Sequence, residues 1–347
     1  MYLPHDDWRW SADKKRHQFH TVDLHTEGEP LRVITKGLPE LKGNTLLEKR
    51  EDFIRNYDFI RKLIILEPRG HADMYGAIML EPINSDADFA VFFLHNEGYS
   101  TMCGHGIIAL TKFVLDTSIF HKRGERVKLK IDTPAGRVVS EAIIKRGKVE
   151  KVYFCNVPSF VYKANRNIFI EDFGVVKYDI VFGGAFYAII DSGQLSLGLS
   201  SKDYFSIVET GIKLKEAIVN VDEIRHPYIK ELSFLYGVIF TGKALEEGHH
   251  SRNVCVFANG EIDRSPTGTG VSARVALLFS RGEIEKNQRI IIESILGTTF
   301  SVEIQDDIVY GPYQAVVPVV GGSSSIIGDS RFYLDSEDNI QEGFIFR

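Results

Sequence analysis

The stretch Ser100–Asp116, "STMCGHGIIALTKFVLD", places a thiol and a Gly-x-Gly sequence directly before an apolar segment. The chain repeats this arrangement about half its length later, where Asp263–Gly270 reads "DRSPTGTG" and continues into "VSARVALLFSRG". The residue before Gly-x-Gly is Cys103 in the first copy and Thr267 in the second. Since both apolar segments have helical periodicity, we expect two equivalent loop–helix units.

The repeat extends beyond these two units. Strand-like sequence precedes each of them, "AVFFLHNEG" in the first half and "SRNVCVFANG" in the second. Further strand pairs follow, with "RIIIESILGTTFSVEI" as the counterpart of "VKLKIDTPAGRVVSEAI". A duplication of this length predicts an α+β fold of two similar domains, mostly antiparallel β, each wrapped on one apolar helix. The helix after Cys103 is apolar nearly all round and is therefore expected to be buried.

We expect a first domain over residues 18–175 and a second over residues 176–324, with the junction near residues 170–185. The strands of residues 325–347 are candidates for completing the first domain. Residues 127–152 have the pattern of antiparallel strands joined by tight turns. Helical periodicity is found in four segments, namely residues 39–62, the segment after Cys103, residues 201–220 and the segment after Thr267. Residues 1–17 read as a charged, partly ordered extension.

Composition and charge exclude several classes of protein. A chain of 347 residues is long enough for two domains with separate cores. The net charge of −6, without a basic cluster, disfavours nucleic-acid binding. The sequence contains neither a signal peptide nor an apolar run of membrane-spanning length, so no membrane partner is expected. Three cysteines without a CxxC pair indicate reduced thiols and a cytoplasmic protein. The oligomeric state stays open, with a homodimer as one candidate.

The start of each buried helix is suited to binding an anion. Its first backbone N–H groups are unpaired and lie at the positive end of the helix dipole, which favours a carboxylate or phosphate. The same position lowers the pKa of a thiol, so we expect Cys103 to be partly thiolate near neutral pH. The alternative is that Cys103 is an unreactive residue packed in the core, where a free cysteine behaves as a small hydrophobic side chain. The polar His105 between Gly104 and Gly106 is a poor setting for core packing and favours a reactive thiol.

The sequence disfavours two classes of cofactor, nucleotides and metal ions. "GHGIIA" and "GTGVSA" fit the G-x-G-x-x-A dinucleotide fingerprint, but the sequence continues into hairpins where that fingerprint needs a parallel βαβ unit. The eleven histidines form no recognised metal-binding spacing. We therefore expect neither a nucleotide cofactor nor a metal. Asp263 is either a turn or cap residue or an acceptor for a substrate ammonium, and the sequence leaves both roles open.

Four segments carry a family resemblance. "MCGHG" and "DRSPTGTG", together with "DLHTEGEPLRV" (Asp23–Val33) and "FGGAFYA" (Phe182–Ala188), resemble the proline racemase family over nearly the whole chain from about residue 19. The resemblance implies a diaminopimelate epimerase-like fold, with two pseudo-symmetric β-rich domains, each around a central helix. It also implies an active site in the cleft between the domains and catalysis without a cofactor.

The second loop departs from the family pattern. In the family's racemases and hydroxyproline epimerases both loops carry cysteine, and one thiolate removes the Cα proton while the other thiol returns one. Here Thr267 takes the second position, and its hydroxyl is no base near neutral pH without an activating partner. The chain resembles instead the hydro-lyase branch that dehydrates trans-3-hydroxy-L-proline to pyrroline-2-carboxylate. That substrate has its hydroxyl on the same ring face as the Cα hydrogen, so one base, Cys103, suffices for syn elimination, and the resulting thiol is on the right side to protonate the leaving hydroxyl.

The resemblance also implies the binding residues. Cys103 and Thr267 hold the two catalytic positions, and the substrate contacts carry over to Gly104, His105, Asp263, Gly268 and Thr269. Two alternatives stay open. One is a proline racemase or hydroxyproline 2-epimerase in which Thr267 serves as the second acid. The other is a non-catalytic protein that binds an amino acid in the same cleft.

Overall fold

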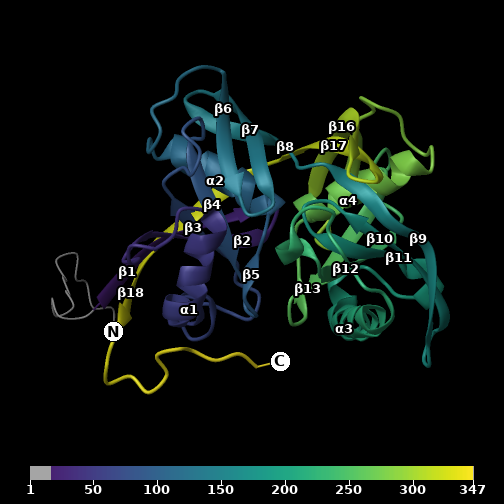
Figure 1. The fold of residues 1–347 in the computed structure, drawn as a ribbon, viewed down its shortest axis with the longest axis horizontal. Coiled ribbons are helices and arrows are strands. Elements are labelled where there is room, and N and C mark those ends of the chain that lie inside the picture. The colour runs from purple at the N-terminus through teal and green to yellow at the C-terminus, as the bar shows by residue number, and fades with distance from the viewer. Residues whose placement is uncertain (1–16, 347) are drawn as a thin grey trace, which may run out of the picture.

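The computed structural model describes residues 17–346. Of the charged extension predicted over residues 1–17, all but His17 lies outside this range. The described chain forms two β-rich lobes, one around helix α2 and the other around helix α4 (Figure 1). No helix within residues 17–346 has the length and apolar character required to cross a bilayer.

The helices lie in the four segments with helical periodicity. They are α1 (Leu46–Ile65), α2 (Gly104–Asp116), α3 (Tyr204–Val221) and α4 (Gly268–Ser280), with short 3-10 turns η1 (Ser192–Leu195), η2 (Ser201–Asp203) and η3 (Lys230–Leu232). Helix α1 begins later than the periodicity predicts. Thr45 caps it by accepting the Glu48 N–H, and Glu48 accepts the Thr45 N–H in return. This capping box fixes the helix start at Leu46.

The first lobe pairs its strands in the order β1–β2–β3–β4–β6–β7–β8. Two of these pairs, β2·β3 and β4·β6, are parallel, and the others are antiparallel. The consecutive antiparallel strands β6, β7 and β8 confirm the hairpin pattern predicted for residues 127–152. The strands are β1 (His17–Thr26), β2 (Glu29–Lys36), β3 (Gly76–Leu80), β4 (Phe89–Leu94), β5 (Tyr99–Ser100), β6 (Arg126–Thr133), β7 (Gly136–Lys145) and β8 (Lys148–Cys155).

The second lobe repeats this order as β10–β11–β12–β13–β15–β16–β17, and β9 pairs with both β10 and β17, which closes a barrel. Its parallel pairs, β11·β12 and β13·β15, occupy the equivalent places, so the duplication predicted from the sequence is confirmed in the topology. The strands are β9 (Ser159–Ile170), β10 (Gly174–Phe182), β11 (Phe186–Asp191), β12 (Leu235–Gly242), β13 (Ser251–Phe257), β14 (Glu261–Ile262), β15 (Ile290–Glu293), β16 (Thr299–Tyr310) and β17 (Tyr313–Gly322).

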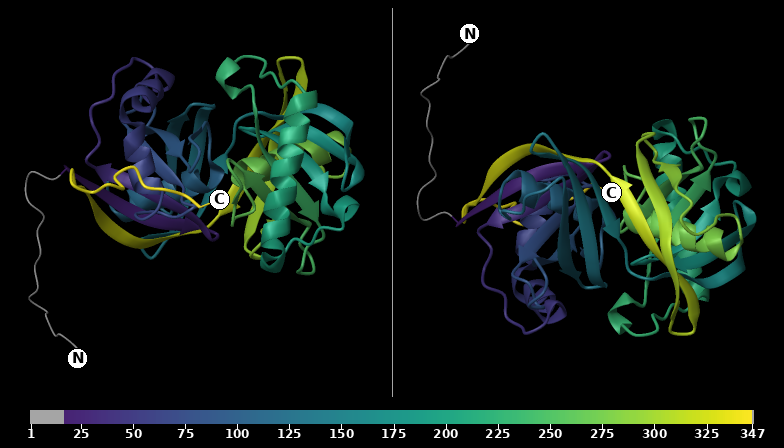
Figure 2. Two further views of the ribbon diagram at one scale, coloured as in Figure 1. Left: turned by 90° about the horizontal axis from the view of Figure 1, so that it is seen from below. Right: turned by 90° about the horizontal axis from the view of Figure 1, so that it is seen from above.

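The C-terminal strand connects the lobes. Strand β17 pairs with β8, and the chain continues almost directly into β18 (Ser324–Leu334), which pairs with β1 along its whole length (Figure 2). Strand β9 lies before the junction expected near residues 170–185, yet it pairs with second-lobe strands. The division of the chain into domains at residues 175 and 176 stays a prediction.

The starts of α2 and α4 meet where the lobes touch. A side-chain Cβ on Gly268 would lie 2.5 Å from the Gly104 Cα, and a Cβ on Gly104 would lie equally close to the Gly268 Cα. Both positions therefore require glycine. Behind this contact both helices are buried on nearly every side, as predicted. The arrangement brings the two loops of the repeat into one place.

Candidate active site

One buried cavity between the lobes is lined by every residue that the sequence singled out. They are Cys103, Gly104, His105, Asp263, Thr267, Gly268 and Thr269. The cavity measures about 10 Å³, which is room for about one water molecule, so an amino acid can enter only if the walls move. Two larger surface hollows, of about 910 and 880 Å³, are lined by other parts of the chain.

Cys103 is the N-cap residue of α2. Its backbone is extended, with φ −143° and ψ 110°, and its Sγ accepts the N–H of Gly106 at 3.2 Å. The His105 ring lies beside it, with Nδ1 3.3 Å from the sulfur. The side chain is only 4% exposed. The helix start therefore directs the thiol into the cavity and gives it one backbone hydrogen-bond donor.

The expectation that Cys103 has a lowered pKa is wrong for this arrangement. Burial raises the pKa of the thiol well above its usual range, because the thiolate loses its hydration. The Gly106 N–H lowers this pKa and the nearby carboxylates of Asp263 and Glu29 raise it, and the shift caused by burial is not reversed. The sequence shows the helix start but shows neither the depth of burial nor the two nearby carboxyl groups.

Thr267 has a different backbone geometry at the equivalent position. Its φ is 66° and its ψ 101°, a left-handed conformation that costs a β-branched residue about 1–3 kcal/mol. Its hydroxyl lies near Asp263, yet Oγ1 is buried and makes no hydrogen bond of acceptable geometry with any described residue. The second loop thus holds a hydroxyl in the cavity that makes no hydrogen bond of acceptable geometry to a base among the described residues.

The two helix starts supply a site for an anion. The first N–H groups of α2 and of α4 have no acceptor within their own helices, and the dipoles of both helices point their positive ends at the cavity. Thr269 adds a side chain that is fixed in place, because its hydroxyl is hydrogen-bonded to that of Tyr187 at 2.6 Å. The two helix starts therefore favour a carboxylate at this part of the cavity once the walls make room for it.

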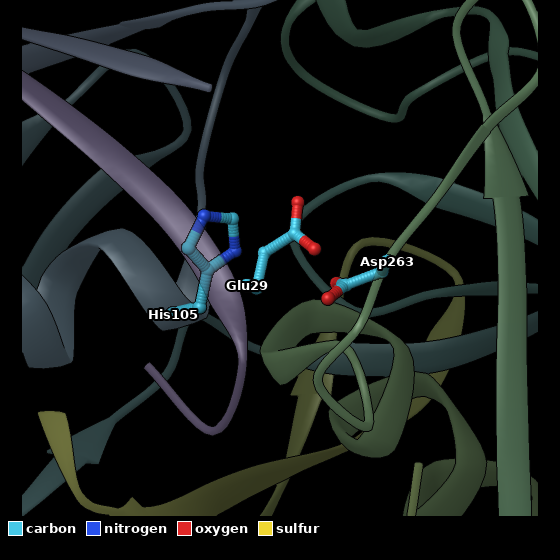
Figure 3. Close-up of side chains that lie close together, drawn as sticks. All are labelled: Glu29, His105 and Asp263. Atoms are coloured by element: carbon cyan, nitrogen blue, oxygen red, sulfur yellow. The ribbon is translucent and has the colours of Figure 1, made fainter. Parts of the chain in front are cut away.

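Glu29, His105 and Asp263 form a cluster that is suited to a cation (Figure 3). They converge from β2, from α2 and from the loop before α4, and one ligand atom of each lies within 4.8 Å of the others. One carboxylate oxygen of Glu29 accepts the Arg264 N–H at 2.6 Å, whereas its other oxygen is buried and unpartnered. The Asp263 carboxylate accepts both the N–H and the hydroxyl of Ser265.

The protonation of this cluster depends on its burial. Desolvation raises the pKa of Asp263 to about 6 and that of Glu29 well above its usual range. Burial also lowers the pKa of His105 to about 3, so its ring is neutral at neutral pH. Two neighbouring carboxyl groups and a neutral imidazole offer acceptors to an ammonium group or a metal ion. A cation held there would also remove the negative charge that opposes ionisation of Cys103.

Sequence reasoning missed four polar residues of this site. Glu29 lies within Asp23–Val33, which served only to identify a family resemblance. Three tyrosines, Tyr75, Tyr187 and Tyr236, line the cavity and received no role. A signal existed for two of them, since "YGAI" at Tyr75 recurs as "YGVI" at Tyr236 just before the equivalent strand positions.

The chain is similar over nearly its whole length to proteins named for activities on proline and hydroxyproline. The sequence profile described as proline racemase matches residues 21–345. A trans-3-hydroxy-L-proline dehydratase of Colwellia psychrerythraea is 42% identical over 99% of this chain and 97% of its own. Another, from Bacillus cereus, is 44% identical over 94% of this chain and 97% of its own. A crystal structure of a hydroxyproline epimerase from Agrobacterium vitis, with bound trans-4-hydroxy-L-proline, has 28% sequence identity and a TM-score of 0.89, covering 95% of this chain and 96% of its own.

Proposed function

Because this chain belongs to the proline racemase family, we propose that it is a trans-3-hydroxy-L-proline dehydratase, a hydro-lyase that works without a cofactor. One observation carries the proposal. Among the residues that the structure describes, Cys103 is the single thiol lining the cavity, and Thr267 stands at the equivalent start of the second helix. The dehydratases among the relatives support the same activity.

The substrate is held at its two charged ends. Its carboxylate lies against the N–H groups at the starts of α2 and α4, from Gly104, His105, Gly268 and Thr269. Its ring ammonium lies in the cluster of Glu29, His105 and Asp263. The two ends together direct one face of the ring toward the first lobe. Cys103 is the base on that face.

The chemistry begins at the Cα hydrogen. The bound ammonium neutralises the carboxylates beside Cys103 and so favours the thiolate, which removes the Cα proton. The charge that develops at Cα spreads onto the substrate carboxylate. Backbone N–H groups at the two helix starts stabilise this charge, and they act strongly in a site that excludes water.

Water then leaves from the same ring face. In trans-3-hydroxy-L-proline the hydroxyl is on the side of the Cα hydrogen, so the elimination is syn and needs no base on the opposite face. The product is an enamine that becomes the cyclic imine Δ1-pyrroline-2-carboxylate. Thr267 faces the other side of the ring, where this reaction requires no proton transfer.

Incubation with trans-3-hydroxy-L-proline tests the proposal, with the cyclic imine detected by o-aminobenzaldehyde. We expect imine to form in proportion to enzyme and time. Formation of the Cα epimer without imine would establish the racemase or epimerase alternative. Binding without conversion would establish the non-catalytic alternative.

We also assign the architecture to the diaminopimelate epimerase-like class, an assignment supported by two pseudo-symmetric β-rich lobes with one central helix each. A cytoplasmic location stays a prediction that the three free cysteines support. The homodimer stays a prediction as well.

A further inference from the structure

Two buried tyrosines from the two halves of the repeat meet beside Cys103. Tyr75 directly precedes β3, and Tyr236 lies at the start of the equivalent strand β12. Their phenol oxygens are 3.2 Å apart, and both side chains line the cavity. The Tyr75 hydroxyl is also hydrogen-bonded to the Ser100 hydroxyl. Packing alone does not require two phenol hydroxyls to face each other in a reaction cavity.

Tyr75 is the member of this pair that lies on the side of the base. It belongs to the first lobe, its ring meets that of His105 edge-on at 4.9 Å, and it lines the cavity together with Cys103. Burial raises the pKa of the Tyr75 phenol well above its usual range, so the hydroxyl stays protonated at neutral pH. Tyr75 therefore carries a proton beside the base on the first-lobe side.

The dehydration requires such a proton. Hydroxide is a poor leaving group, and the trans hydroxyl departs on the face occupied by Cys103. The acid must therefore lie on this face and be protonated when the C–O bond breaks. Thr267 faces the other side of the ring, which leaves two acids on this face, the newly formed Cys103 thiol and the Tyr75 phenol.

We propose that Tyr75 is the general acid that protonates the departing hydroxyl, an assignment that rests on the proposed dehydratase function. The Cys103 thiolate takes the Cα proton, and the C–H electron pair forms the new carbon–carbon double bond. The C–O bond breaks with its electrons on oxygen, which takes the Tyr75 proton and leaves as water. The thiol proton of Cys103 then passes to the Tyr75 phenolate, which restores both groups. Tyr236 is a positioning residue that donates a hydrogen bond to the phenolate.

The test compares Tyr75→Phe with Tyr236→Phe on two substrates. With trans-3-hydroxy-L-proline, Tyr75→Phe should lower kcat by about 10²-fold or more, which is the usual contribution of a general acid. With trans-3-fluoro-L-proline, whose fluoride needs far less protonation to leave, the same variant should release fluoride at nearly the wild-type rate. The readouts are imine formation and a fluoride electrode, with enzyme-free controls. Tyr236→Phe should lose about tenfold on the hydroxyl substrate, the low end of what a hydrogen bond to a charged group contributes, since Tyr75 still donates the proton.

The rate of fluoride release distinguishes an acid role of Tyr75 from a purely structural role, because a structural defect would slow both substrates. Wild-type dehydration by Tyr75→Phe, or equal losses on both substrates, would overturn the assignment of Tyr75. Failure of the wild-type enzyme to form imine would instead overturn the dehydratase function itself.

Discussion

The two loops of the repeat share a scaffold and differ in chemistry. Both follow a short strand and open a thirteen-residue helix at a glycine. In the first, Cys103 has an extended backbone, and its sulfur accepts the Gly106 N–H. In the second, Thr267 has a left-handed backbone and makes no capping bond with its side chain. The first loop therefore presents a thiol to the cavity, whereas the second presents a hydroxyl that makes no hydrogen bond of acceptable geometry with a described residue.

The loops also differ in length. Strand β5 ends at Ser100, close before Cys103, whereas β14 ends at Ile262, further before Thr267. The longer second loop contains Asp263, whose carboxylate joins the cation cluster, and Arg264, whose N–H binds Glu29. The first copy of the repeat thus carries the thiol, and the second adds a carboxylate to the cation cluster and a backbone donor to Glu29. Duplication gave the scaffold, and local divergence gave each copy its task.

The proposed difference between the two loops fails most completely if Cys103 is not the base. Cys103→Ser should lower the rate of imine formation by roughly 10³-fold or more, because a buried serine hydroxyl is far too basic to ionise. The o-aminobenzaldehyde assay measures the rate, and circular dichroism checks that the fold is kept. Substantial turnover by a folded Cys103→Ser variant would remove Cys103 from the mechanism.

The next largest loss of activity is expected from a substitution at the contact between the starts of α2 and α4. Gly268→Ala places a Cβ 2.5 Å from the Gly104 Cα, so the lobes must shift. A displacement of about 1 Å at the reacting groups costs on the order of 10²-fold in rate. Gly98→Ala is the matched control, since its Cβ would meet nothing within 4 Å. Equal activity of the two variants would show that the close approach is not needed.

The acidic residue unique to the second loop should set the pH dependence of the reaction. The pKa of Asp263 is raised to about 6 by burial, so its carboxylate is charged above that pH and neutral below it. As pH falls through about 6, kcat/KM should fall about tenfold per unit because the ammonium loses its counter-charge. Asp263→Asn should have lower kcat/KM and lack this acid limb. An unchanged limb in the variant would assign it to another group.

Replacing the Thr267 hydroxyl by a thiol tests the proposed difference between the two loops directly. Thr267→Cys should keep dehydration within about tenfold of wild type, since the opposite face transfers no proton. It should also gain inversion of L-proline or 4-hydroxyproline, because a thiol would then stand on both faces. Chiral chromatography after long incubation compares the variant with wild type. Loss of dehydration in the folded variant would show that Thr267 has a role in the elimination.

Removal of metal ions by a chelator should have the smallest effect on activity. The cluster of Glu29, His105 and Asp263 could ligate a metal, but the proposed chemistry uses it for the substrate ammonium. Activity should therefore be unchanged after dialysis against EDTA. Inhibition that is restored by a divalent metal would assign the cluster to a metal ion.

The fold and much of the site follow from local sequence, but the electrostatics do not. Periodicity and repetition predicted α2, α4 and the residues at their starts, because each signal lies within a few consecutive positions. Tyr75 reaches the cavity from the position before β3, and Glu29 joins His105 and Asp263 from β2. Both residues are far from either loop in sequence, so only the folded chain brings them near Cys103. The pKa of Cys103 was mispredicted for the same reason, since its burial and nearby carboxylates are tertiary features.

The most direct test of the single-base account is the configuration of unreacted substrate during turnover. Trans-3-hydroxy-L-proline is incubated with wild-type enzyme to partial conversion, and the remaining amino acid is separated by chiral chromatography. An enzyme with one base, Cys103, should leave only trans-3-hydroxy-L-proline beside the imine product. Accumulation of cis-3-hydroxy-D-proline, the Cα epimer, would show that a proton reaches the opposite face and would contradict the account.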